Sequence, residues 1–249
     1  MHTLRVVRTL GAIDVRNVRR DPLLRWIVVL PLLIALPVRW GLPLIVQRIS
    51  GLVGVDLLAY YPLAMSYALL LLAPVLAGMV IGFLLLDQRD DRTLSALQVT
   101  PLPLNGYLTY RLAAPMLVSM GTTVIVLPVA GLVEVDVRIL MAISLAAAPM
   151  APLVAVALAS FAANKVQGFA LVKMSGLFLI APLGAYFAPP RWEWAFAVVP
   201  TYWPAKVLWT ISAEGANAWL YLLLGLAYQM LLLWLLLRRF QVVMHRSIT

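Results

Sequence analysis

Six long runs of apolar residues dominate the pattern of hydrophobic and polar positions along this chain. A helix needs about 20 residues to cross a bilayer core of roughly 30 Å. The alternation expected of a membrane β-barrel strand is absent from these runs. The pattern therefore predicts an all-α membrane protein with a single transmembrane domain over residues 1–249. Its six transmembrane helices are expected at about 22–46, 60–86, 110–133, 139–163, 166–189 and 216–238.

Residues 1–20 show a different pattern, in which the polar positions follow a helical period. On a helical projection five arginines fall on one side and most apolar residues on the other. This favours an amphipathic helix that lies in the membrane interface, with its arginines toward anionic headgroups. A disordered basic tail is the alternative. The arginines are Arg5, Arg8, Arg16, Arg19 and Arg20.

The segment Arg191–Glu214 is too polar and too interrupted by proline to span a membrane, yet it is rich in aromatic residues. We expect short helices there that lie in the outer leaflet or dip into it. The distribution of basic residues predicts that the N-terminus and the C-terminus both lie in the cytoplasm, which places this segment on the outer side. With both termini inside, 13 of the 19 lysines and arginines fall on the cytoplasmic side, as the positive-inside rule requires. The predicted location is a bacterial-type plasma membrane.

Composition agrees with a membrane protein. The chain is 63% hydrophobic and 12% charged, with a mean hydropathy of +0.96. Its net charge of +9 is better explained by the cytoplasmic ends of the helices than by a nucleic-acid partner. Cysteine is absent and the only histidines are His2 and His245, which excludes thiolate and histidine-rich metal sites.

Five charges fall within the six positions between the second and third runs: Asp87, Arg89, Asp90, Asp91 and Arg92. The simplest interpretation is a solvated loop. A second is a Mg²⁺-dependent, membrane-embedded transferase that holds the metal with Asp87, Asp90 and Asp91. Such a site needs several converging carboxylates, and no other cytoplasmic segment offers an acidic pair. The transferase is therefore the less favoured alternative.

A third interpretation is a docking helix. Leu94 and Leu97 share one helical face directly after the charges. Pro101 and Pro103 then end the helix and return the chain to the third span. A short charged and apolar helix between two transmembrane helices suits force transmission from a soluble partner.

This stretch resembles the cytoplasmic coupling segment of type-2 ABC transporter permeases. The matching positions are Thr93, Leu94, Leu97, Thr100, Pro101, Leu102 and Tyr107, with Arg111 where the family has Lys. The chain departs from that pattern at Arg92, Pro103 and Tyr110, where the family keeps Gly, Ser and Gly. Two further stretches are similar to the family: Arg19-Arg20-Asp21-Pro22 before the first span, and Pro200-Thr201-Tyr202 followed by Lys206.

The resemblance implies the permease subunit of an ATP-driven exporter, in which two permease copies join two P-loop ATPase subunits. ATP and Mg²⁺ are expected on the ATPase, because this chain contains no Walker A sequence. Leu94 and Leu97 are expected to anchor the coupling helix in a groove of the ATPase. The predicted coupling residues are Asp87, Arg89, Asp90, Asp91, Arg92, Thr93, Leu94 and Leu97.

The expected substrate is a hydrophobic drug, an antibiotic or a lipid-like molecule. Candidate pathway residues are Met116, Met120, Lys173, Met174 and Gln229. Each also has a plain structural interpretation: methionine fills gaps between helices, Lys173 snorkels to the interface, and Gln229 forms an interhelical hydrogen bond. A self-contained channel is not favoured, because the sequence shows no pore-lining ring of one residue type.

Overall fold

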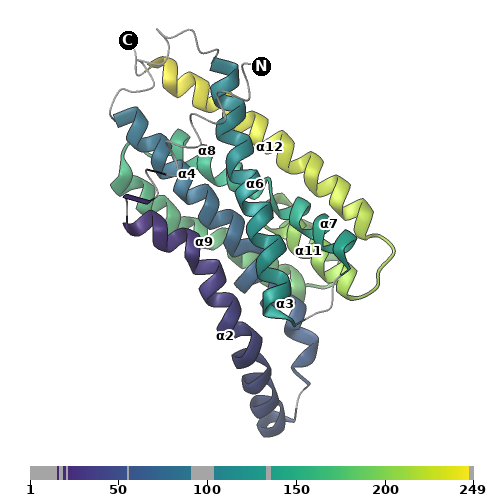
Figure 1. The fold of residues 1–249 in the computed structure, drawn as a ribbon. Helices are drawn as coiled ribbons and strands as arrows, with labels where there is room; N and C mark the ends of the chain where they lie inside the picture. The colour runs from purple at the N-terminus through teal and green to yellow at the C-terminus, as the bar shows by residue number, and fades with distance from the viewer. Residues whose placement is uncertain are drawn as a thin grey trace.

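The computed structural model describes residues 16, 19–20, 22–54, 56–90, 104–132 and 136–246, and these residues form helices and connecting turns with no strand (Figure 1). In chain order the elements are α2 (Pro22–Val53), η1 (Leu58–Tyr60), α3 (Tyr61–Met65), the π-helical η2 (Ser66–Leu71), α4 (Leu72–Asp90), α6 (Leu104–Ala130), α7 (Val137–Ala147), α8 (Met150–Phe161), α9 (Lys165–Phe187), α10 (Pro190–Glu193), η3 (Trp194–Val198), α11 (Tyr202–Ser212) and α12 (Ala218–Arg246).

Six helical stretches of the described chain are long and apolar enough to cross a membrane, which confirms the predicted all-α, six-span fold. The second stretch joins η1, α3, η2 and α4 into one span, and the fourth joins α7 and α8. The first helix continues to Val53, beyond the expected end at residue 46. Of the proposed interfacial helix, Arg16, Arg19 and Arg20 are helical and exposed, and its remaining residues lie outside the described part.

The fourth span is divided by proline. Helix α7 ends at Ala147 and α8 begins at Met150, with a turn at Ala148 and Pro149. Pro149 has no N–H to donate to the preceding turn, so the helix breaks there. By contrast, Pro31, Pro37 and Pro43 lie inside α2 without ending it.

The centre of the bundle is the contact between α4 and α8, where two glycines face the neighbouring helix. A Cβ atom on Gly78 would lie 2.4 Å from the Ala151 carbonyl oxygen. One on Gly82 would lie 2.8 Å from Cδ1 of Leu158. Small residues at this spacing let two membrane helices approach closely. The helices α2, α6, α9 and α12 surround the second and fourth spans (Figure 1). The second and fourth spans are mostly buried, whereas the surrounding helices expose apolar side chains.

The second span connects the two ends of the bundle. At one end, which we call the Asp87 end, α4 finishes and α9 begins, and Lys165 Nζ lies 2.9 Å from Asp87 Oδ1. At the other, which we call the Glu193 end, Leu58 lies near Glu193, where α10 finishes. The connections at the Glu193 end carry several side-chain hydrogen bonds and an ion pair.

Candidate functional site

The segment Arg191–Glu214 folds into short helices, as the sequence predicted, and its longest helix dips into the bundle. Along α11, Tyr202, Trp203, Ala205, Val207 and Leu208 are buried. They pack against α12, α7 and the start of the second span. At the Glu193 end, α11 therefore fills part of the space between the spans with its side chains.

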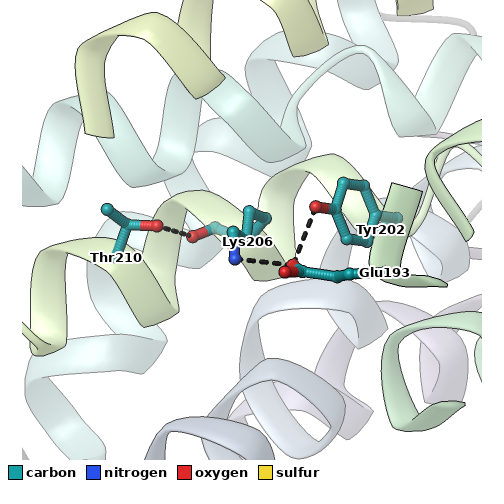
Figure 2. A network of polar contacts seen from close by, with 4 residues as sticks. All are labelled: Glu193, Tyr202, Lys206 and Thr210. Atoms are coloured by element: carbon teal, nitrogen blue, oxygen red, sulfur yellow. Dashed lines mark hydrogen bonds and ion pairs between the residues drawn. The ribbon is translucent and has the colours of Figure 1, made fainter. Parts of the chain in front are cut away.

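A half-buried ion pair joins α10 to α11 (Figure 2). Lys206 Nζ lies 2.5 Å from Glu193 Oε1, and the two side chains are only 19% and 16% exposed. The Tyr202 hydroxyl donates to the same carboxylate oxygen at 2.8 Å. Burial, followed by this hydrogen bond and the charge of Glu193, raises the pKa of Tyr202 well above its ordinary value. Tyr202 is thus held as a protonated donor to Glu193.

Thr201 has a defined role in this arrangement. Pro182 lies inside α9 and has no N–H, so the carbonyl of Phe178, one turn earlier, loses its helical partner. The Thr201 hydroxyl donates to that Phe178 oxygen at 2.6 Å. Side-chain hydroxyls commonly satisfy a carbonyl freed by proline in a membrane helix. The Pro200-Thr201-Tyr202 stretch therefore ties α11 to both α9 and α10.

Tyr67 interrupts the neighbouring backbone hydrogen bond of α9, between Leu179 and Leu183. Its hydroxyl donates to the Leu179 carbonyl and accepts a 2.8 Å hydrogen bond from the Leu183 amide. In an uninterrupted helix these two backbone groups would bond to each other. Tyr67 lies on the π-helical turn η2 of the second span. The Tyr67 side chain of the second span is thus inserted between two backbone groups of the fifth span.

Two further hydrogen bonds fix the start of the second span. Trp209 Nε1 donates to Ser66 Oγ at 2.8 Å, and the Tyr186 hydroxyl donates to the Ala59 carbonyl at 2.6 Å. The rings of Tyr186 and Trp209 meet edge-to-face with centroids 5.0 Å apart. These contacts hold the second span, α9 and α11 around an open space.

That space is a cavity of about 680 Å³, open to the surface at the Glu193 end. Its size lies within the range of small-molecule sites. Glu193 and Lys206 are the charged residues of its lining, so the wall carries one charge of each sign. Lys206 Nζ also lies 5.3 Å from the centre of the Tyr221 ring. The remaining lining residues are Leu58, Ala59, Pro62, Ala185, Tyr186, Ala188, Trp209, Thr210, Ser212, Ala213, Gly215, Ala216 and Asn217.

The cavity has the features of a binding site for a polar group. Its wall provides an ammonium, a carboxylate and three aromatic rings. Among the described residues no group of three or more His, Asp or Glu side chains is placed to hold a metal ion. Of the aspartates proposed for Mg²⁺, Asp87 and Asp90 belong to the last turns of α4, and Asp91 lies outside the described residues.

The predicted coupling residues are described only in part. Asp87 pairs with Lys165, so it links the end of the second span to the start of the fifth. Arg89 and Asp90 complete α4. The role of all three in ATPase coupling stays a prediction. The other predicted coupling residues lie outside the described part of the chain: Asp91, Arg92, Thr93, Leu94 and Leu97.

The predicted pathway residues lie on three helices. Met116 and Met120 are half-buried on α6, and Lys173 and Met174 are exposed on α9. Gln229 is fully buried on α12 and donates to the Ala146 carbonyl at 3.1 Å, which is the interhelical hydrogen bond that its sequence position favours. None of the five lines the cavity at the Glu193 end. Their role in a substrate pathway stays a prediction.

The sequence pointed to Lys206 and Tyr202 but not to Glu193, Tyr186, Trp209 or Tyr221. One signal was available: a carboxylate in a hydrophobic aromatic segment requires a partner when it is buried. The identity of that partner depends on how α10 meets α11, which the local pattern does not specify.

Comparison with known proteins gives the family. The family model described as Rv2686c-like, fluoroquinolones export permease protein Rv2686c-like, matches residues 14–237. The chain is 36% identical over 239 residues to the fluoroquinolones export permease protein Rv2686c of Mycobacterium tuberculosis (strain ATCC 25618 / H37Rv), covering 95% of this chain and 94% of the relative. The same values hold for the fluoroquinolones export permease protein MT2760 of Mycobacterium tuberculosis (strain CDC 1551 / Oshkosh). No solved structure matches the chain. With its six spans, the chain therefore belongs to the Rv2686c-like family of export permeases, which are multi-pass membrane proteins.

Proposed function

We propose that this chain is the membrane-spanning subunit of an ATP-driven exporter and that a separate P-loop ATPase supplies the energy. Two copies of the permease and two of the ATPase form the working complex. The observation that carries the proposal is the 36% identity to fluoroquinolones export permeases over 95% of the chain. The likeness of residues 93–102 to a coupling segment of ABC permeases supports the ATPase partner.

The proposed substrates are fluoroquinolones or similar planar aromatic drugs, as the names of the relatives indicate. Exposed apolar side chains support a hydrophobic pathway. Met174 and Phe178 on α9 are 63% and 54% exposed, and Leu117 on α6 is 69% exposed. In the proposed complex a second permease copy faces part of this surface, and the drug passes between the copies.

The proposed orientation places the Asp87 end in the cytoplasm of a bacterial-type cell and the Glu193 end outside. Basic residues support it. Lys165 begins α9 at the Asp87 end. Near the end of α12, Arg239 lies 4.2 Å from the ring centre of Phe161, the last residue of α8. Positive charge near helix ends is typical of the cytoplasmic face.

Coupling is proposed to act through the second span. Movement of the ATPase displaces the segment after Asp90, and α4 transmits this movement directly because it is continuous with that segment. The close contact at Gly78 and Gly82 passes it to α8. The ion pair of Asp87 with Lys165 passes it to α9. ATP then shifts the population between inward-open and outward-open states through its different contacts with each.

The test uses the full chain co-expressed with a candidate P-loop ATPase. Wild-type complex is expected to lower fluoroquinolone accumulation in cells and to show drug-stimulated ATP hydrolysis. Leu94→Asp and Leu97→Asp place a charge on the proposed apolar anchors and are expected to lower drug stimulation at least about tenfold. Val242→Asp makes the same kind of change at an exposed position near the end of α12 and serves as control.

Two results would contradict the proposal. One is wild-type stimulation in an assembled complex that carries both Leu94→Asp and Leu97→Asp. The other is fluoroquinolone export that continues when the ATPase subunit is absent or carries an inactive Walker A lysine.

A further inference from the structure

The cavity at the Glu193 end holds both signs of charge within one small region of its wall. Glu193 Oε1 and Lys206 Nζ are 2.5 Å apart. An ammonium has three N–H donors and a carboxylate accepts at about four lone-pair sites, so the ion pair leaves capacity on both partners. A ligand with one positive and one negative group can contact the two at once.

The wall selects against ligands with a single charge. A cation is attracted by Glu193 but repelled by Lys206, and an anion meets the reverse. A ligand with one positive and one negative group is attracted by both Glu193 and Lys206, provided that its two charges are about as close together as those two side chains. The wall therefore fits a compact zwitterion rather than a molecule whose charged groups stand at opposite ends of a rigid ring system.

The surroundings of the cavity are those of a membrane interface. Trp192 and Trp194 are 68% and 52% exposed beside Glu193, and such aromatic residues commonly lie at the headgroup level. On two helices, exposed apolar residues are next in sequence to residues that line the cavity. Phe187 follows the lining residue Tyr186 on α9, and Leu220 precedes Tyr221 on α12. A headgroup in the cavity thus has apolar helix surface beside it for acyl chains.

From these observations we infer that the cavity binds the headgroup of a phospholipid that carries both a phosphate and a primary ammonium. The phosphate lies beside Lys206 and the ammonium beside Glu193. A phosphoethanolamine headgroup has the required compactness, because a short ethylene linker separates its charges. Its ammonium provides N–H donors for Glu193, and charge-assisted hydrogen bonds of this kind are the stronger ones. Tyr202, which donates to Glu193, fixes the position of the carboxylate.

The test is lipid retention by the purified full chain in detergent. After delipidation the protein is titrated with phosphatidylethanolamine or with phosphatidylglycerol of the same acyl chains, and bound lipids are counted by native mass spectrometry. Phosphatidylglycerol has the phosphate but no ammonium. Retention of phosphatidylethanolamine is expected to exceed that of phosphatidylglycerol about tenfold.

The decisive variant is the double substitution Glu193→Gln with Lys206→Gln. It removes both charges together, so neither charge is left without its partner, which would destabilise the fold. Its preference for phosphatidylethanolamine is expected to fall to about onefold. Arg191→Gln removes an exposed charge two positions from Glu193 and is expected to keep the preference. Unfolding temperatures of all three proteins show that each is folded.

Three outcomes overturn the inference. They are equal retention of the two lipids by wild type, an unchanged preference in the double variant, and binding of soluble phosphoethanolamine as tightly as the lipid, which would assign the cavity to a soluble zwitterion. Because the permease is measured without ATPase or drug, a failure here leaves the proposed export function untouched. A failure of export likewise leaves this result standing.

Discussion

Pro182 removes one backbone N–H donor from the fifth span. The hydrogen bond that this donor would have made is supplied by Thr201, the residue directly before α11. The Thr201 hydroxyl takes the place of the missing N–H at the Phe178 carbonyl. In a membrane the alternative is an unsatisfied carbonyl, which costs several kcal/mol because no water replaces the bond. The proline and the threonine are therefore energetically coupled across two helices.

This coupling is testable with a double-mutant cycle. Thr201→Val keeps the side-chain volume, removes the hydroxyl and is expected to cost about 1–3 kcal/mol of unfolding free energy. In a Pro182→Ala background the new amide of residue 182 can bond to the Phe178 oxygen, so Thr201→Val is expected to cost much less. Chemical unfolding of the four proteins in detergent measures both costs. Equal costs in the two backgrounds would contradict the coupling.

Tyr202 leads to a prediction about pH. Because its folded-state pKa is raised, the folded protein holds the phenol proton more tightly than the unfolded chain does. The resulting stabilisation is fully present below the unfolded value of about 10 and is lost as pH rises through the folded-state value. We expect wild type and Tyr202→Phe to show the same rise in tyrosinate absorbance up to about pH 11. A larger rise in folded wild type over that range would show that Tyr202 ionises normally.

At the scale of elements, the contact between α4 and α8 sets the geometry of the bundle. The two helices approach so closely at Gly78 that a Cβ atom would meet backbone rather than a movable side chain. Gly121 on α6 is the opposite case, since a Cβ atom there meets nothing within 4 Å. The two positions form a matched pair for substitution.

Gly78→Ala is expected to destabilise the protein by about 1–3 kcal/mol, because overpacking forces the helices apart. Gly121→Ala is expected to be neutral or to stabilise by up to about 1 kcal/mol, because alanine is the better helix former. Thermal unfolding in detergent compares the two variants with wild type. A Gly78→Ala variant as stable as Gly121→Ala would mean that α4 and α8 are not in close contact.

The sequence was sufficient for the six spans because the membrane imposes their length and polarity on each helix separately. The sequence was less informative where contacts with neighbouring helices determine the local structure. The proline pattern did not distinguish Pro149, which ends α7, from Pro37, which α2 accommodates. The π-helical turn at Ser66–Leu71 and the Tyr67 insertion have no local signature. The ion pair of Glu193 with Lys206 likewise depends on how α10 meets α11, and that contact arises only in the folded chain.

On the scale of the whole molecule, the absence of cysteine makes topology directly measurable. Asn217→Cys, in an exposed loop at the Glu193 end, is expected to react with a membrane-impermeant maleimide in intact cells. Val242→Cys, exposed near the end of α12, is expected to react only after permeabilisation. The reverse pattern would invert the orientation proposed above, and labelling of both in intact cells would mean that α12 does not cross the membrane between the two positions.

The Tyr67 insertion has a mechanical consequence for the fifth span. Around Pro182, bonds to Thr201 and Tyr67 replace two successive backbone hydrogen bonds of α9, so neighbouring elements help to hold the part near Phe187. Tyr186 adds a bond from that part to Ala59 of the second span. When the second span moves, we therefore expect the last turns of the fifth to move with it and α9 to bend at Pro182.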